Sequence, residues 1–154
     1  MRGDEGAAGL YLTAMSITTR LADLKDDFSF LDSWEERYRH IIELGRTLPD
    51  LSDAERTDAN KVRGCASQVW IVAGREGAPP VLRLKGDSDA HIVRGLVAIM
   101  LALYDGASAA DVAALPPEQA FAELGVADAL SAQRSNGLKA MAARIRAEAE
   151  ALPA

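Results

Sequence analysis

The sequence predicts an α+β fold, in which a small antiparallel β-sheet packs against several helices. Apolar residues recur at three- and four-residue spacing before residue 49 and after residue 91, as on one face of a helix. Between these regions, residues 68–73 are β-branched and aromatic, and residues 81–85 alternate apolar with basic side chains. This second pattern is typical of two strands joined as a hairpin, with one face of the sheet in contact with solvent.

Two helices are expected ahead of the hairpin. One begins at about Thr19, and a stronger one begins at Ser33, which forms a Ser-x-x-Glu capping box with Glu36. Pro49 bounds this second helix, because the residue before a proline is pushed out of the α conformation. The polar stretch 50–61 is expected to connect the helix to the first strand, with one short helical turn.

The C-terminal half is expected to be helical. Asp87 or Ser88 should cap the most apolar helix, whose hydrophobic side chains cover most of its circumference and predict that it is buried. Two short helices follow, and a last amphipathic helix is expected from about Ser135. We expect one domain, residues 16–154, behind a disordered extension formed by residues 1–15.

The composition excludes several classes of protein. The 154 residues include Lys+Arg 17 against Asp+Glu 23, a net charge of −6, whereas a general nucleic-acid binder needs a dominant basic field. The longest apolar stretch, residues 96–103, is far shorter than the ~20 residues of a membrane span. The first residues are acidic where a signal peptide needs positive charge. We therefore expect a cytoplasmic protein that binds neither nucleic acid nor a membrane.

A single cysteine, Cys65, limits the chemistry further. One thiol cannot form an intrachain disulfide, a Cys-rich zinc site or a Cys-ligated iron–sulfur cluster, so no metal or cofactor is expected in this chain. Gly64 precedes it and allows backbone conformations that are closed to other residues. Lys61 and Arg63 are close in the sequence, and positive charge lowers a thiol pKa. This setting is typical of a poised thiol at a turn.

A lone poised thiol leaves three functions open. Neither His40 nor His91 has a spacing that ties it to Cys65 as a general base, and no second cysteine is present for thiol–disulfide exchange. Cys65 could carry a sulfane sulfur as a persulfide. It could instead be oxidised by peroxide, as in a one-cysteine thiol peroxidase or a redox sensor. In the third interpretation it is an inert residue of a protein-interaction module.

Three ordered blocks of the sequence resemble the SufE family of sulfur acceptor proteins. The first comprises residues 34–38 (WEERY), 41–45 (IIELG) and 48–49 (LP). The second is 62–70 (VRGCASQVW), and the third comprises 86–90 (GDSDA) and 92–96 (IVRGL). With later matches at Arg134 and Gly137, the resemblance covers most of the chain from about Trp34 onward. Ala66 departs from the family pattern, in which a polar glutamine is common at this position.

The resemblance implies a fold shared with IscU-type scaffolds and a function in iron–sulfur cluster assembly by the SUF system. Cys65 would take sulfur from the persulfide of a SufS- or CsdA-like cysteine desulfurase, stimulate that enzyme, and pass the sulfur to a SufBCD-like scaffold. Pyridoxal phosphate would belong to the desulfurase. The chain would then be a sulfurtransferase-like relay rather than a stand-alone enzyme. Its oligomeric state, a homodimer included, stays open.

Six further residues are candidate supporting or partner-binding residues of the same site: Arg63, Gly64, Ser67, Asp87, Asp89 and Arg134. The two aspartates are expected to act first as helix-capping acids and second as partner contacts. The arginine at 134, just ahead of the last helix, matches a family position near the cysteine loop. Family structures also place this loop against an apolar cavity. Nearby cations would lower the pKa of the thiol, whereas burial in such a cavity would raise it.

Overall fold

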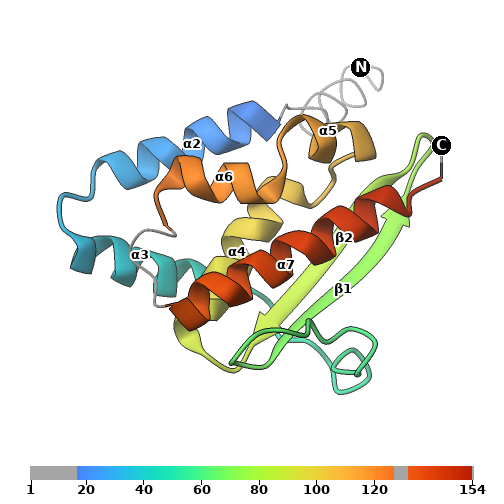
Figure 1. Cartoon of the computed structure of the whole chain (residues 1–154), viewed down its shortest axis with the longest axis horizontal. Helices are drawn as coiled ribbons and strands as arrows, with labels where there is room; N and C mark the ends of the chain where they lie inside the picture. Colours follow the sequence, from blue (N-terminus) through green and yellow to red (C-terminus); the bar gives the residue numbers. More distant parts are fainter. Residues whose placement is uncertain (1–16, 127–131, 154) are drawn as a thin grey trace, which may run out of the picture.

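The computed structural model describes residues 17–126 and 132–153 (Figure 1). The predicted N-terminal extension, residues 1–15, lies outside the described residues. The elements are α2 (Ile17–Ser29), α3 (Trp34–Arg46), β1 (Val69–Glu76), β2 (Val81–Ser88), α4 (His91–Tyr104), α5 (Ala109–Ala114), α6 (Pro117–Leu124) and α7 (Ala132–Glu150). This order of helices, one hairpin and further helices confirms the predicted α+β class.

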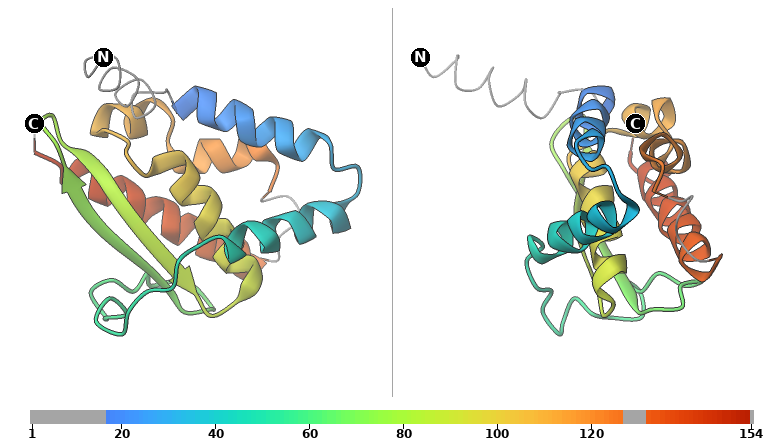
Figure 2. Two further views of the ribbon diagram at one scale, coloured as in Figure 1. Left: turned by 180° about the vertical axis from the view of Figure 1, so that it is seen from behind. Right: turned by 90° about the vertical axis from the view of Figure 1, so that its left-hand side faces the viewer.

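The antiparallel hairpin runs alongside α7, and α4 is the central helix of the described residues (Figures 1 and 2). β1 and β2 pair in register from Val69 opposite Ser88 to Glu76 opposite Val81. α4 contacts β2, α2, α3 and α7, and the right-hand view of Figure 2 places α3 and α7 on opposite sides of it. The predicted wet face is confirmed, because Arg83 and Lys85 are exposed while Leu82 and Leu84 are buried.

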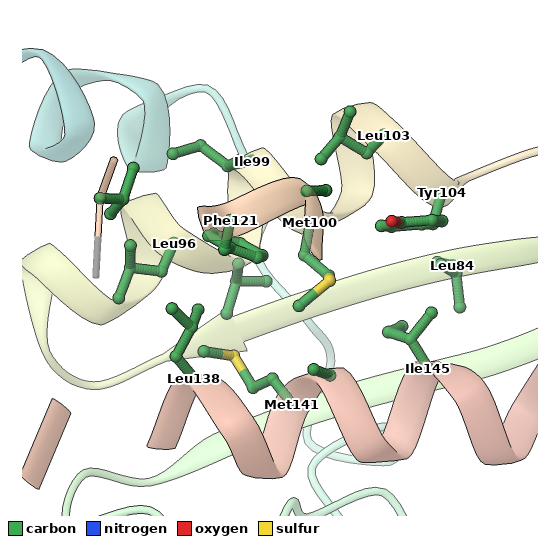
Figure 3. Close-up of a cluster of buried hydrophobic side chains, with 14 of the residues drawn as sticks. Leu84, Leu96, Ile99, Met100, Leu103, Tyr104, Phe121, Leu138, Met141 and Ile145 are labelled. Carbon is green, nitrogen blue, oxygen red and sulfur yellow. The ribbon is translucent and has the colours of Figure 1, made fainter. Parts of the chain in front are cut away.

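The hydrophobic core lies around α4, which confirms that the most apolar helix is buried. Figure 3 shows the side chains that meet there from α4, α6 and α7: Leu96, Ile99, Met100, Leu103, Tyr104, Phe121, Leu138, Met141 and Ile145. Burying a large apolar side chain contributes about 1.5–3 kcal/mol relative to leaving it exposed. The core therefore fixes α7 against α4, and α7 is the helix that borders the loop carrying Cys65.

Glycines let α3 and α4 cross at backbone contact. A Cβ on Gly95 would overlap the carbonyl group of Ile41, and a Cβ on Gly45 would lie 2.7 Å from the backbone nitrogen of Gly95. Distances below 3.0 Å are not seen for real Cβ atoms. The two helices can approach this closely only because neither glycine carries a side chain.

β2 is longer than the sequence pattern predicts, which corrects the role of Asp87 and Ser88. Both belong to the strand, and α4 begins at His91 with Ala90 as an N-cap that makes no side-chain capping bond. The strand continues because Gly86 allows it to approach α4, where a Cβ would lie 2.6 Å from Val97 Cγ1. The prediction that Asp87 caps the central helix is therefore wrong.

Other helix boundaries follow their local signals more closely. Ser33 caps α3 by accepting a hydrogen bond from the Glu36 N–H at 3.1 Å. Pro117 occupies the first turn of α6, where its missing N–H costs nothing. The last helix, however, begins at Ala132 rather than at about Ser135. Arg134 therefore lies inside α7, not ahead of it.

Candidate functional site

The cysteine loop, residues 63–68, is a tight excursion at the start of β1. Its two ends are tied together, because the Val62 N–H donates to the Val69 carbonyl at 2.8 Å. Gly64 adopts φ +93°, in the left-handed region that favours glycine. This confirms the predicted turn and places Cys65 against α7, where its thiol donates to the Gly137 carbonyl at an Sγ–O distance of 3.6 Å.

Beside the thiol lies a small cavity between the cysteine loop, α4 and α7. Its volume is about 20 Å³, and it is lined by Cys65, Ala66, Ser67, Val93, Leu96, Arg134, Gly137 and Met141. A cavity needs about 10–15 Å³ to hold one water molecule. The space beside Sγ thus has room for a single atom of about that size.

Gly137 keeps this cavity open. Glycine in a helix interior costs about 1 kcal/mol relative to alanine, yet Gly137 is a buried residue within α7. A Cβ at this position would lie 3.5 Å from Sγ of Cys65 and 3.7 Å from its Cβ. An added methyl would therefore make an ordinary contact with the thiol and would occupy part of the space beside Sγ.

Burial raises the pKa of the Cys65 thiol above its ordinary value because the low-dielectric surroundings penalise the thiolate. Of the two opposing influences expected from the sequence, burial prevails in this conformation. Lys61 and Arg63 line a different hollow, which Cys65 does not line. The expectation that these cations bring the pKa of the thiol below its ordinary value is therefore wrong for this geometry.

We expect the rate of Cys65 alkylation by iodoacetamide to rise with pH to a midpoint above the value of about 8.5 for a free cysteine. The reason is that only the thiolate reacts, and burial keeps the thiol protonated to higher pH. The pH profile of the native protein should be compared with that of the urea-unfolded protein, in which the midpoint should fall back. A native midpoint at or below the unfolded one would contradict this account of the thiol.

Asp89 anchors the C-terminal end of the cysteine loop. Its Oδ1 accepts a hydrogen bond from the Gln68 N–H at 3.0 Å, and its own N–H donates to the Gln68 carbonyl at 3.2 Å. The Ser88 hydroxyl donates to the same carbonyl at 2.7 Å. Asp89 therefore acts on the loop rather than as a cap of α4.

Asp87 is the buried centre of a charge cluster away from the thiol cavity. Its side chain is 4% exposed, and it pairs with Arg56 at 2.9 Å and with Arg94 at 3.4 Å. The Arg56 guanidinium lies 5.8 Å from the ring centroid of Trp70. Arg94 also donates to the Gly45 carbonyl at 2.9 Å. The cluster thus ties the connection between α3 and β1 to β2 and α4.

The two arginines of this cluster are not among the candidate site residues predicted from the sequence. Arg94 carried a signal, since it is a charged residue in the most apolar helix and a buried charge there needs a partner. Arg56 carried none, because it lies 31 residues from Asp87 in the sequence.

The other sequence-predicted residues divide between two places. Ser67 and Arg134 line the thiol cavity with Cys65, and Arg134 donates to the Tyr38 hydroxyl at 3.1 Å, which joins α7 to α3. Arg63 is exposed at the hollow beyond the loop. Neither histidine lines the thiol cavity. His91 begins α4, and His40 packs edge-on against Phe28 with ring centroids 5.3 Å apart. A role in function stays a prediction for Arg63, Ser67 and Arg134.

Residues 17–126 and 132–153 contain no cluster of three or more His, Cys, Asp or Glu side chains that could hold a metal ion. Within the same part of the chain, no helix is both long enough and apolar enough to cross a membrane.

Comparison with known proteins places these features in a family. Residues 22–149 match the SufE family, described as an Fe-S metabolism associated domain. The chain is 55% identical over 132 residues to an uncharacterized SufE-like protein of Rhizobium etli, which covers 84% of this chain and 89% of that protein. It is 50% identical over 139 residues to an uncharacterized SufE-like protein of Rhizobium meliloti strain 1021, covering 88% and 99% respectively.

A solved structure shares the fold. The solution structure of a hypothetical protein from Thermus thermophilus superposes with a TM-score of 0.66 at 20% identity, and the match covers 87% of this chain and 93% of that one. The family match spans the cysteine loop, both strands and most of α7. The chain therefore belongs to the SufE family, whose domain is associated with Fe–S metabolism.

Proposed function

We propose that the protein is a sulfur acceptor and carrier for iron–sulfur cluster assembly, with Cys65 as the residue that holds the sulfur. The donor is the persulfide of a cysteine desulfurase, and the recipient is an assembly scaffold. One observation carries the proposal: the single thiol of the chain faces a cavity of about 20 Å³ that a helical glycine keeps open. Membership of a family associated with Fe–S metabolism supports it.

The transfer is a thiol exchange without net oxidation or reduction. The Cys65 thiolate attacks the outer sulfur of the donor persulfide, and the sulfur–sulfur bond of the donor breaks. The donor cysteine leaves as a thiolate, and Cys65 now carries the persulfide. The proton that Cys65 loses on forming its thiolate is returned to the leaving thiolate, so the transfer ends with a thiol on the donor.

The surroundings of Cys65 suit a protected carrier more than a free nucleophile. Burial keeps the resting thiol protonated and unreactive, and the cavity beside the thiol holds one small group at most. A donor cysteine needs the loop to open, because Cys65 is only partly accessible. The apparent affinity for the donor is then reduced by the fraction of open conformer, and the Gln68–Asp89 contacts are among those that hold the loop closed.

The Cys65→Ser variant tests the proposal. A desulfurase incubated with cysteine should release sulfide faster when the wild-type protein is added, and Cys65→Ser should abolish this stimulation. The variant should keep its melting behaviour within about 0.5 kcal/mol, because the change is small and lies in a loop. Arg75→Ala, at the far end of β1, is the control that should stimulate as the wild type does.

The same variants separate the two alternatives. A one-cysteine thiol peroxidase would consume peroxide in the presence of an external thiol and would not depend on the desulfurase. An interaction module with an inert cysteine would stimulate equally well as Cys65→Ser. Either result would overturn the proposed function.

A further inference from the structure

A hollow with basic side chains lies next to the cysteine loop and shares no lining residue with the thiol cavity. It is bounded by residues 58–63 and by α7, with a volume of about 440 Å³, and its lining residues are Asp58, Ala59, Lys61, Val62, Arg63, Ala140, Ala143 and Arg144. We call Lys61, Arg63 and Arg144 the cationic rim. These three cations face one lining carboxylate, that of Asp58, in a chain whose net charge is −6.

Two members of the cationic rim have no ion pair within residues 17–126 and 132–153: Lys61 and Arg63. The third member, Arg144, donates to the Ala59 carbonyl at 3.0 Å and pairs loosely with Glu148 at 3.7 Å. By contrast, Lys25, Arg56, Lys85 and Arg94 each have a carboxylate within 3.4 Å. The charges of Lys61 and Arg63 are therefore left for solvent or for a partner.

The cationic rim lies close enough to Cys65 to be covered by any protein that reaches the thiol. Arg63 is two residues from Cys65, and Arg144 is seven residues along α7 from Gly137, which the thiol contacts. Seven helical residues span about 10 Å. A standard interface buries about 800 Å² on each partner, a patch of roughly 16 Å radius. A protein whose donor cysteine reaches Cys65 thus also covers the cationic rim with its own surface.

We propose that the cationic rim is a docking surface for an acidic patch on the cysteine desulfurase. This inference rests on the proposed function and adds the chemistry by which the partner is selected. Covering two cations without counter-charges would cost desolvation energy, so a carboxylate-rich surface is the complement that binds. The rest of this chain is acidic and repels such a patch. The rim therefore orients the encounter so that the donor persulfide arrives at the cysteine loop.

A matched pair of charge reversals tests the proposal. Arg63→Glu and Arg75→Glu each lower the net charge by two, from −6 to −8. Both arginines are exposed and lack an ion pair within the described residues, but Arg75 lies at the far end of β1. Desulfurase stimulation is measured against the concentration of each variant at 25 mM and 250 mM NaCl.

We expect Arg63→Glu to raise the half-saturating concentration about five-fold at 25 mM NaCl with little change in the maximal rate, because rim charges act mainly on association. The difference should shrink at 250 mM NaCl, because the Debye length there is shorter than the value of about 10 Å at 0.1 M salt. The half-saturating concentration of Arg75→Glu should stay within about two-fold of the wild type, because salt screens a charge at the far end of β1 from the interface. Equal shifts in the two variants would overturn the proposal, as would a shift seen only in transfer to the scaffold.

A second measurement decides the point without a partner. The rate of Cys65 alkylation by anionic iodoacetate is divided by the rate with neutral iodoacetamide, which cancels changes in loop opening and in thiolate fraction. Arg63→Glu should lower this ratio about two- to three-fold at 25 mM NaCl, and Arg75→Glu should leave it nearly unchanged. The proposed function fails separately, if the wild type gains no sulfur when it is incubated with a cysteine desulfurase and cysteine. An unchanged ratio in Arg63→Glu contradicts the cationic rim itself.

Discussion

Replacing Asp87 by alanine is expected to lower the free energy of unfolding by about 3 kcal/mol, the lower end of the range for breaking a buried ion pair. The carboxylate is almost fully buried and pairs with both Arg56 and Arg94. Its removal leaves two guanidinium groups near one another with only the exposed carboxylates of Asp53 and Asp50 as partners. The cost stays at the lower end because the two arginine side chains are 34% and 23% exposed and can recover some hydration.

The matched control for this prediction is Asp53→Ala. Asp53 also pairs with Arg56, at 3.8 Å, but its side chain is fully exposed, and surface pairs contribute little. Urea unfolding followed by circular dichroism should show a clear loss of stability for Asp87→Ala and no measurable loss for Asp53→Ala. Equal midpoints for the two variants would mean that the buried cluster does not hold the connection between α3 and β1.

The second large effect is expected for Gly95→Ala, which should destabilise the protein by about 2–3 kcal/mol. Alanine would normally stabilise a helix by about 1 kcal/mol relative to glycine, so the predicted sign is opposite to that of helix propensity. The added methyl would overlap the Ile41 carbonyl. α3 and α4 would have to separate, and the packing around the fully buried Ile41 would loosen.

Gly137→Ala is the control for this prediction, because it makes the same substitution in another helix. There the added Cβ would lie at an ordinary contact distance of 3.5 Å from Sγ of Cys65. Thermal melting should therefore show a higher midpoint for Gly137→Ala and a lower one for Gly95→Ala. A midpoint for Gly95→Ala at or above that of the wild type would refute the close crossing of α3 and α4.

Local signals in the sequence predicted most of the fold. The Ser33 cap, the alternation in β2 and the apolar circumference of α4 each depend on neighbouring residues, so one sequence is enough to find them. The exceptions depend on tertiary contacts. β2 runs on to Ser88 because Gly86 packs against α4, and no local pattern distinguishes that glycine from one in a turn.

The candidate site shows the same division. Cys65 and the positive φ at Gly64 were predictable from the sequence alone. The direction of the thiol pKa shift was not, because nearness in sequence placed Lys61 and Arg63 beside Cys65 while the fold directs them to another hollow. The pairing of Arg56 with Asp87 likewise joins residues that only the folded chain brings together.

The mass of the intact protein after incubation with a cysteine desulfurase and cysteine tests the sulfur-carrier proposal most directly. We predict that the wild type gains mainly the mass of one sulfur atom, because the cavity beside Cys65 is too small for a longer polysulfide chain, and that a reductant removes it. Cys65→Ser should gain nothing. The absence of added mass, or added mass that survives the reductant, would contradict the proposal that Cys65 carries a persulfide.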